Sequence, residues 1–119
     1  MLNSGEEGMM VFEPAFIRVK KGESVTFLPT DPGHDSVSVY TPEGASGWAG
    51  KNSKEVTVTF DTEGVYLYKC TPHAMMGMVG VIQVGETHNK KAVKKAVKKL
   101  SKTVAMNKDR LKKYMADVK

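Results

Sequence analysis

The chain has 119 residues, 40% of them hydrophobic, and its 18 basic and 13 acidic residues give a net charge of +5. This length suits a single domain with one hydrophobic core, which we expect to span residues 1–119. No run of about 18 apolar residues and no basic-then-apolar start is present, so we expect neither a membrane span nor a signal peptide in this chain. A secreted protein whose signal has been removed would look the same.

Residues 9–84 consist of short apolar or β-branched segments separated by turn residues, which is typical of an all-β sandwich. The predicted strands are Met10–Glu13, Phe16–Lys20, Ser24–Pro29, Ser36–Tyr40, Glu55–Phe60, Val65–Cys70 and Val79–Val84. In the fifth of these, Val56 and Val58 alternate with Thr57 and Thr59, so one face can be buried while the other stays polar. Residues 41–54, with four Gly or Pro, are expected to form a loop between sheets.

The pattern changes after Gly85, and the charge changes with it. Residues 1–86 carry 6 basic and 11 acidic side chains, whereas residues 87–119 carry 12 and 2. Apolar residues recur at helical spacing between Ala92 and Val104 and again between Leu111 and Val118, with Asn107 as the expected N-cap of the second helix. We therefore predict a sandwich over 1–86 and a helical extension over 87–119.

A basic amphipathic helix can bind an anionic membrane or a nucleic acid. Here the apolar stripe is narrow and made of small residues, and the first helix has no aromatic side chain for base stacking. These features favour packing on the sheet with solvated lysines. We expect neither a nucleic acid nor a membrane as partner.

The segment from Cys70 to Met78, called the ligand loop below, joins two predicted strands. It presents a thiolate at Cys70, an imidazole three residues later at His73, and a thioether at Met78. A second imidazole, His34, follows the turn Asp31–Gly33 at the start of another strand. Two imidazoles, one thiolate and a weak axial thioether form the copper site that proteins use for electron transfer.

Each of these residues also has an ordinary structural explanation. A lone cysteine is often a small buried hydrophobe, and clustered methionines usually fill a core. The combination of Cys70, His73 and Met78 in one short loop, with His34 at a strand start, favours the metal site. The third histidine, His88, lies beyond the last strand with no potential ligand beside it, so we expect it at the surface or as a helix cap.

The sequence resembles the cupredoxin family of blue-copper proteins, and within it the branch with two C-terminal helices. The segments that carry the resemblance are Met1–Asn3, Met10–Pro14, Gly33–His34, Cys70–His73 and Met76–Met78. The resemblance covers essentially the whole chain. It implies a mainly β, eight-stranded Greek-key sandwich and one type 1 copper held by His34, Cys70, His73 and Met78. It further implies a periplasmic electron carrier that is no enzyme and that donates electrons to nitrite or nitrous oxide reductase in denitrification.

Two features beside the predicted ligands depart from the family or tune the site. Family members usually have Asn where this chain has Asp35, and that Asn ties the two ligand loops together at the position of Thr71. A carboxylate can accept a hydrogen bond from the Thr71 hydroxyl but cannot donate one. The negative charge of Asp35 should stabilise Cu(II) and lower the reduction potential. Pro72 lacks an N–H, which leaves the backbone N–H of Asp35 as the expected donor to the Cys70 sulfur. An equally good explanation of Pro72 is that it shapes a tight turn.

The resemblance also implies that electrons pass through an exposed edge of His73. The apolar docking patch around it would consist of Met10, Pro72, Ala74, Met75 and Met76, where Ala74 and Met75 replace the Tyr and Ala common in the family. Lys51, Lys54 and Lys69 lie in segments from which they could attract an acidic partner. The protein itself is expected to be a monomer.

Three other functions use the same features. A periplasmic copper chaperone or copper-storage protein would use the four ligands together with Met9, Met75 and Met76. A thiol enzyme would use Cys70 with His73 as its base, but it needs a substrate cleft and an oxyanion hole that no motif indicates. A nucleic-acid or membrane binder built on the basic extension would bind in a strongly salt-dependent way, even without copper.

Overall fold

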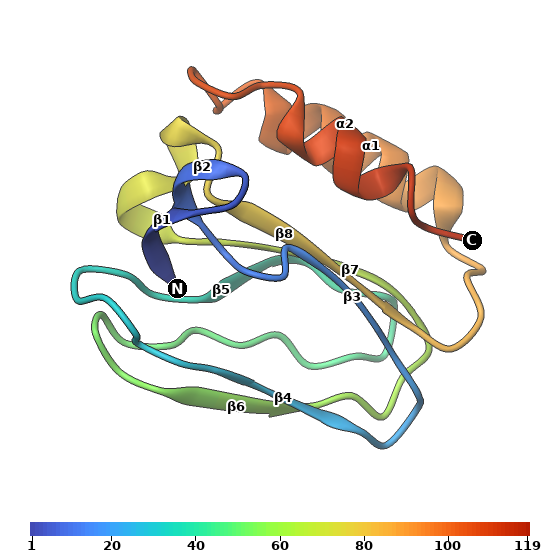
Figure 1. Ribbon diagram of the computed structural model, residues 1–119. Helices are drawn as coiled ribbons and strands as arrows, with labels where there is room; N and C mark the ends of the chain where they lie inside the picture. The colour runs from blue at the N-terminus through green and yellow to red at the C-terminus, as the bar shows by residue number, and fades with distance from the viewer.

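The computed structural model describes residues 1–119 as a sandwich of eight strands, with two helices over one face (Figure 1). The strands are β1 (Leu2–Gly5), β2 (Gly8–Val11), β3 (Phe16–Val19), β4 (Ser24–Phe27), β5 (Val37–Tyr40), β6 (Val56–Thr59), β7 (Gly64–Lys69) and β8 (Val79–Val84). A short 3₁₀ helix, Thr71–Met76, separates β7 from β8, and the chain ends with α1 (Lys90–Ser101) and α2 (Arg110–Met115). The predicted mainly β, eight-stranded sandwich with two C-terminal helices is confirmed.

The strands form three sheets. The central sheet has the order β3-β8-β7-β5, in which β3 runs parallel to β8 and the other neighbours are antiparallel. Strands β4 and β6 form a two-stranded antiparallel sheet on the other side of the sandwich, and β1 pairs with β2 in a hairpin at one end (Figure 1).

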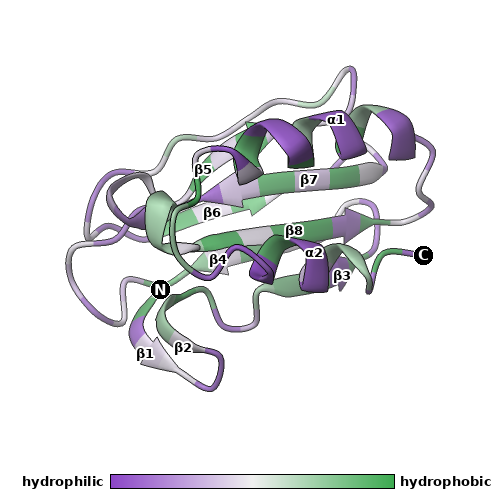
Figure 2. Ribbon diagram, turned by 90° about the horizontal axis from the view of Figure 1, so that it is seen from above, coloured by the Kyte–Doolittle hydropathy of each residue, from purple (hydrophilic) through white to green (hydrophobic).

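Both central strands are covered on two sides, which explains why their residues do not alternate. All six residues of β8 and the first five of β7 are buried. From above, α1 lies over β7 and β5 while α2 lies over β8 (Figure 2). Strands covered on both faces are largely apolar, and Gln83 is the one exception among these buried residues. Neither helix is long and apolar enough to pass through a lipid bilayer.

The predicted periodicities are confirmed in two elements. In β6, Val56 and Val58 are partly buried and the threonines between them are exposed. In α1, Val93 and Leu100 are buried seven residues apart, on the face that packs on the sheet. Strand β8 has the predicted bounds, whereas β2 begins two residues before the predicted start and ends at Val11.

The predicted N-cap of the second helix is wrong. The residue at the cap position of α2 is Asp109, not Asn107. Asn107 has a φ of 55°, in the left-handed region that asparagine tolerates better than most residues, and its side chain donates to the carbonyl of Met76 at 3.0 Å. The polar side chain of Asn107 therefore bonds to the ligand loop instead of capping the helix.

Candidate metal centre

The ligand loop folds back on itself at the end of β7. The N–H of Cys70 donates to the carbonyl of Met78 at 3.0 Å, and the N–H of Met78 donates to the carbonyl of His73 at 3.3 Å. Pro72 stands in the first turn of the 3₁₀ helix, where its missing N–H costs nothing. Gly77 ends this helix with a φ of 87°. These backbone bonds bring Cys70, His73 and Met78 together.

His34 reaches the same place from a different part of the chain. It precedes β5, whose first residue, Val37, is paired in register with Lys69 next to Cys70. The turn at residues 51–54 supports the His34 segment. Ser53 donates its N–H to the His34 carbonyl at 2.8 Å, and its hydroxyl accepts from the N–H of Gly33 at 2.8 Å.

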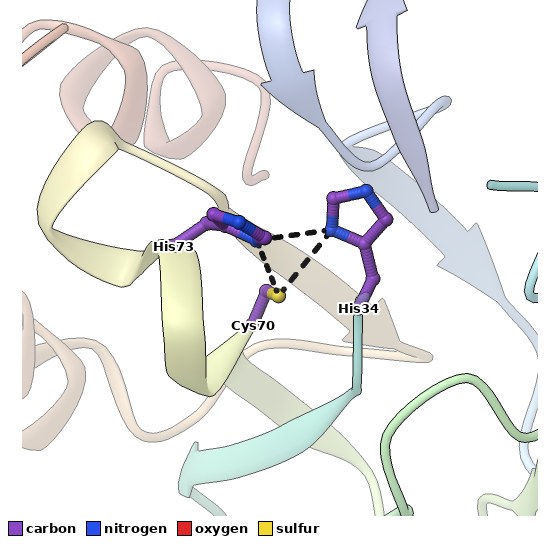
Figure 3. Close-up of side chains that lie close together, drawn as sticks. All are labelled: His34, Cys70 and His73. Carbon is purple, nitrogen blue, oxygen red and sulfur yellow. Dashed lines mark hydrogen bonds between the residues drawn. The ribbon is translucent and has the colours of Figure 1, made fainter. Parts of the chain in front are cut away.

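Three ligand atoms converge at the end of the sandwich (Figure 3). The Nδ1 atoms of His34 and His73 are 3.1 Å apart, and the Cys70 Sγ lies 3.7 Å from the first and 3.5 Å from the second. His34 and Cys70 are fully buried, while His73 is partly exposed.

The size of this triangle fits a metal ion. A point in its plane lies about 2.0 Å from all three atoms, close to the roughly 2.0–2.1 Å of a metal–imidazole bond and the roughly 2.3 Å of a metal–thiolate bond that are known for zinc. Two imidazoles and a thiolate around one point form the trigonal set of a type 1 copper site. The imidazole nitrogens are borderline donors and the thiolate sulfur is a soft donor, and copper fits this set.

Asn3 determines which nitrogen of His34 is free. The His34 Nε2 lies 2.7 Å from the Oδ1 of Asn3, so Nε2 carries the proton and donates it to this acceptor. Nδ1 is then unprotonated and directed at Cys70 and His73, as metal binding requires. Asn3 was quoted above as part of the resemblance, but nothing in the local sequence indicates this contact across 31 positions.

Burial lowers the pKa of the His34 imidazole and raises that of the Cys70 thiol, so that both groups favour their neutral form. Burial, with a smaller effect of His73, lowers the pKa of His34 and keeps its imidazole neutral. Burial raises the pKa of the Cys70 thiol, which the backbone N–H groups of Asp35 and His73 partly oppose. The predicted approach of the Asp35 N–H to this sulfur agrees with that effect. A metal must displace the thiol proton when it binds.

Asp35 ties the two ligand segments together, but through a different donor from the one predicted. Its Oδ1 accepts a 2.6 Å hydrogen bond from the backbone N–H of Thr71, not from the hydroxyl. The prediction of a hydroxyl bond is wrong because the 3₁₀ helix begins at Thr71, and the N–H groups of a first turn have no partner within the helix. An acceptor alone is enough for this tie, so the carboxylate satisfies it.

The remaining predicted site residues are placed as follows. Met78 is fully buried and is joined by its backbone to Cys70 and His73. Pro72 and Met75 are exposed, and Met10, Ala74 and Met76 are partly exposed. Lys51 and Lys54 are exposed, Lys69 is partly exposed, and His88 is exposed as predicted.

Comparison with known proteins places these features in context. Residues 1–85 match the model of a family described as copper binding proteins, plastocyanin/azurin family. The chain is 48% identical over 99 residues to the pseudoazurin of Methylorubrum extorquens, and 47% identical over 88 residues to that of Paracoccus pantotrophus. These alignments cover 82% and 72% of this chain but only 67% and 61% of the relatives.

A solved structure is similar over the entire chain. The crystal structure of native pseudoazurin from Hyphomicrobium denitrificans superposes with a TM-score of 0.85 at 37% identity. The match covers 100% of this chain and 94% of that one, so it includes the two C-terminal helices that the family model leaves out.

Proposed function

Because the chain belongs to the plastocyanin/azurin family of copper-binding proteins and is of the pseudoazurin kind, we propose that it carries single electrons between redox partners. Proteins of this family transfer electrons and are not enzymes. The observation that carries the proposal is the triangle formed by Nδ1 of His34, Nδ1 of His73 and Sγ of Cys70. A fully buried Cys70 also argues against a thiol enzyme, whose nucleophile must reach a substrate.

We propose that His34, Cys70, His73 and Met78 would hold the copper, with the thioether of Met78 as the weakest of the four donors. Bound copper supplies a centre that alternates between Cu(I) and Cu(II), for which thiolate and thioether suit the first state and imidazole suits both. The chain keeps this centre dry, because three of the four ligands are fully buried. It also holds the ligand segments together through Asn3, Asp35 and Ser53.

His73 is the proposed exit for electrons, since it is the one ligand that is partly exposed. The docking patch of Met10, Pro72, Ala74, Met75 and Met76 would surround it and allow a partner to approach closely. Lys51 and Lys54 belong to the turn that bonds to the His34 segment, and Lys69 is next to Cys70, so all three lie at the metal end. Positive charge at that end would attract an acidic redox protein and mainly raise the association rate.

On the family resemblance, we propose a nitrite or nitrous oxide reductase as the acceptor. We propose a periplasmic setting and a monomer that meets its partner transiently, with residues 1–119 forming one domain around a common core. Transient encounters suit an apolar patch with a basic rim, because such a surface releases its partner quickly.

The visible spectrum of the copper-loaded protein tests the proposal. Addition of Cu(II) to the apoprotein should produce an intense thiolate-to-copper band that a mild reductant bleaches and an oxidant restores. Cys70→Ser should lack the band entirely, whereas His88→Ala, which changes an exposed histidine outside the centre, should keep it. A colourless complex that holds copper mainly as Cu(I) would contradict the electron carrier.

That colourless outcome would favour the second candidate, a copper chaperone or storage protein. Two methionines support it, because the side chains of Met9 and Met75 are 61% and 58% exposed. Exposed thioethers bind Cu(I) and can pass it on. Copper exchange with a chelator distinguishes the two functions, since a chaperone releases its metal readily and a buried electron-transfer centre does not.

A further inference from the structure

The end of the ligand loop is bonded to the segment that joins the two helices. The carbonyl of Met75 accepts from the N–H groups of Ala105 at 2.7 Å and Met106 at 3.0 Å. The next carbonyl, that of Met76, accepts from the side-chain amide of Asn107 at 3.0 Å. Two successive carbonyls between His73 and Met78 thus have donors about 30 residues away in sequence.

Arg110 continues this series to the third carbonyl and links it to β2. The side chain is buried, with 5% exposure, and Nη1 donates to Gly77 at 3.4 Å and to Met10 at 2.9 Å. Nη2 donates to the carbonyls of Met9 at 2.9 Å and Glu7 at 3.3 Å. No carboxylate pairs with this guanidinium, since the one salt bridge in the structure involves a different basic residue. A buried charge must be satisfied by other means, and here four carbonyl groups do so.

Backbone conformation supports a tight connection at this point. Gly77 has a φ of 87°, and a Cβ added there would lie 2.9 Å from the carbonyl oxygen of Met106. Asn107 and Met10 both have a φ of 55°, which is unfavourable for residues other than glycine. Such conformations persist where the surroundings hold them. Both residues take part in the bonds described above.

We propose that Asn107 and Arg110 are positioning residues of the metal centre. They hold residues 75–77 in place, so that His73 and Met78 keep one arrangement whether or not copper is bound. Asp35 does the same for the start of the loop through Thr71. The proposal rests on the ligand set proposed above, and it assigns a role in the metal centre to the helical extension, which contributes no ligand.

The apoprotein provides a direct test, because Cys70 is the single cysteine and is fully buried. A thiol reagent such as 5,5′-dithiobis(2-nitrobenzoate) can modify it only when the ligand loop opens. Asn107→Gly removes the bond to Met76 and also relieves the unfavourable φ, so the unfolding midpoint should stay the same or rise. We expect modification of Cys70 to become at least about fivefold faster in this variant and at least about tenfold faster in Arg110→Met.

Val93→Ala is the matched control. Val93 is fully buried in the same helical extension but packs on the sheet, away from the loop. This variant should lower the unfolding midpoint without accelerating the modification of Cys70 under native conditions. Equal acceleration in Val93→Ala and Asn107→Gly, or an unchanged rate in Asn107→Gly, would overturn the proposal. If Arg110→Met does not fold, the comparison of Asn107→Gly with Val93→Ala still tests the proposal.

The copper-loaded protein gives a second readout. In Asn107→Gly, copper should pass to a chelator several-fold faster than in the wild type, and the ratio of its visible bands should change because the ligands are less constrained. A purely structural role would leave the spectrum unaltered. The thiol measurement needs no copper, so a wild-type protein without the blue colour would count against the proposed function and leave the test of positioning intact.

Discussion

Two side chains outside the predicted ligand set, Asn3 and Asp35, bond directly to the segments that carry the ligands. The Oδ1 of Asn3 accepts a hydrogen bond from the Nε2–H of His34 and thereby leaves Nδ1 free. Asp35 accepts from Thr71 and brings a negative charge close to Cys70. At the scale of single residues, we therefore expect the first to affect copper affinity and the second to affect reduction potential.

Asn3→Ala should weaken copper binding by about 10- to 100-fold, as the loss of such a supporting hydrogen bond typically does. Asn3→Asp should remain within a few-fold of the wild type, because a carboxylate also accepts from Nε2. Both variants keep the bond from the Asn3 backbone to Asp31, so the hairpin should stay in place. Competition with a chelator of known affinity measures the effect. Equal affinities for the wild type and Asn3→Ala would show that Asn3 has no such role.

Asp35→Asn should raise the reduction potential by on the order of tens of millivolts, given that 59 mV corresponds to a tenfold change for one electron. The carboxylate stabilises the more positive Cu(II) state, and the amide keeps an oxygen that accepts from Thr71. Asp61→Asn, an exposed change beyond the far end of β6, is the control and should leave the potential unchanged. Cyclic voltammetry measures both. A potential that stays the same or falls in Asp35→Asn would refute the electrostatic argument.

At the scale of elements, Asn89 shows how α1 is attached to the sheet. It occupies the cap position of α1, yet its side chain does not bond to the helix. Its Oδ1 accepts from the N–H of Val65 at 3.1 Å, and its Nδ2 donates to the carbonyl of Val65 at 3.2 Å. Beyond the end of β5, this amide takes the place of a neighbouring strand and satisfies both backbone groups of a buried residue in β7.

Asn89→Ala should reduce the free energy of unfolding by about 1–3 kcal/mol, since it leaves two buried backbone groups without a partner. Asn52→Ala is a suitable control, because Asn52 is exposed and bonds only to the neighbouring serine. Denaturant titration of the two variants gives the comparison. A loss in Asn89→Ala no larger than in the control would mean that water replaces the amide.

At the scale of the whole molecule, negative and positive charges lie in different parts of the chain. The sandwich, residues 1–86, carries a net charge of −5, and the extension, residues 87–119, carries +10. Six of the twelve basic residues of the extension are exposed lysines of α1, the helix that lies over β7 and β5 (Figure 2). The lysines at the metal end are few by comparison. Position relative to the ligands, and not total charge, should therefore decide which lysines affect electron transfer.

Reversal of charge at Lys51 should slow electron transfer to an acidic partner about tenfold at low ionic strength, and the difference should shrink as salt is added. The double variant Lys94→Glu/Lys95→Glu changes more charge but on α1, and its rate should stay within about twofold of the wild type. Stopped-flow measurements with a reductase as acceptor compare them. If the electron-transfer rate falls equally in the two variants, the partner either docks at another surface or responds to the charge of the whole molecule.

Local sequence alone indicated seven of the eight strands, both helices and three of the four proposed ligands, but not β1. Alternation in β6, the spacing of Val93 and Leu100, and the short interval from Cys70 to Met78 are all set by the geometry of one element or one loop. Such features depend on residues a few positions apart, and their periodicity is visible without a structure.

Tertiary structure alone decided which distant groups complete the centre. Asn3 meets His34 and Arg110 meets the carbonyl of Gly77, while Asp35, expected at Thr71 from the resemblance, accepts from its backbone N–H and not from its hydroxyl. These contacts join residues more than 30 positions apart, and nothing in the local pattern distinguishes their side chains from solvent-exposed ones. The sequence therefore indicated the residues that we propose as metal ligands, whereas the packing of hairpin, loop and helices determined how they are oriented, because orientation depends on contacts that only the folded chain brings together.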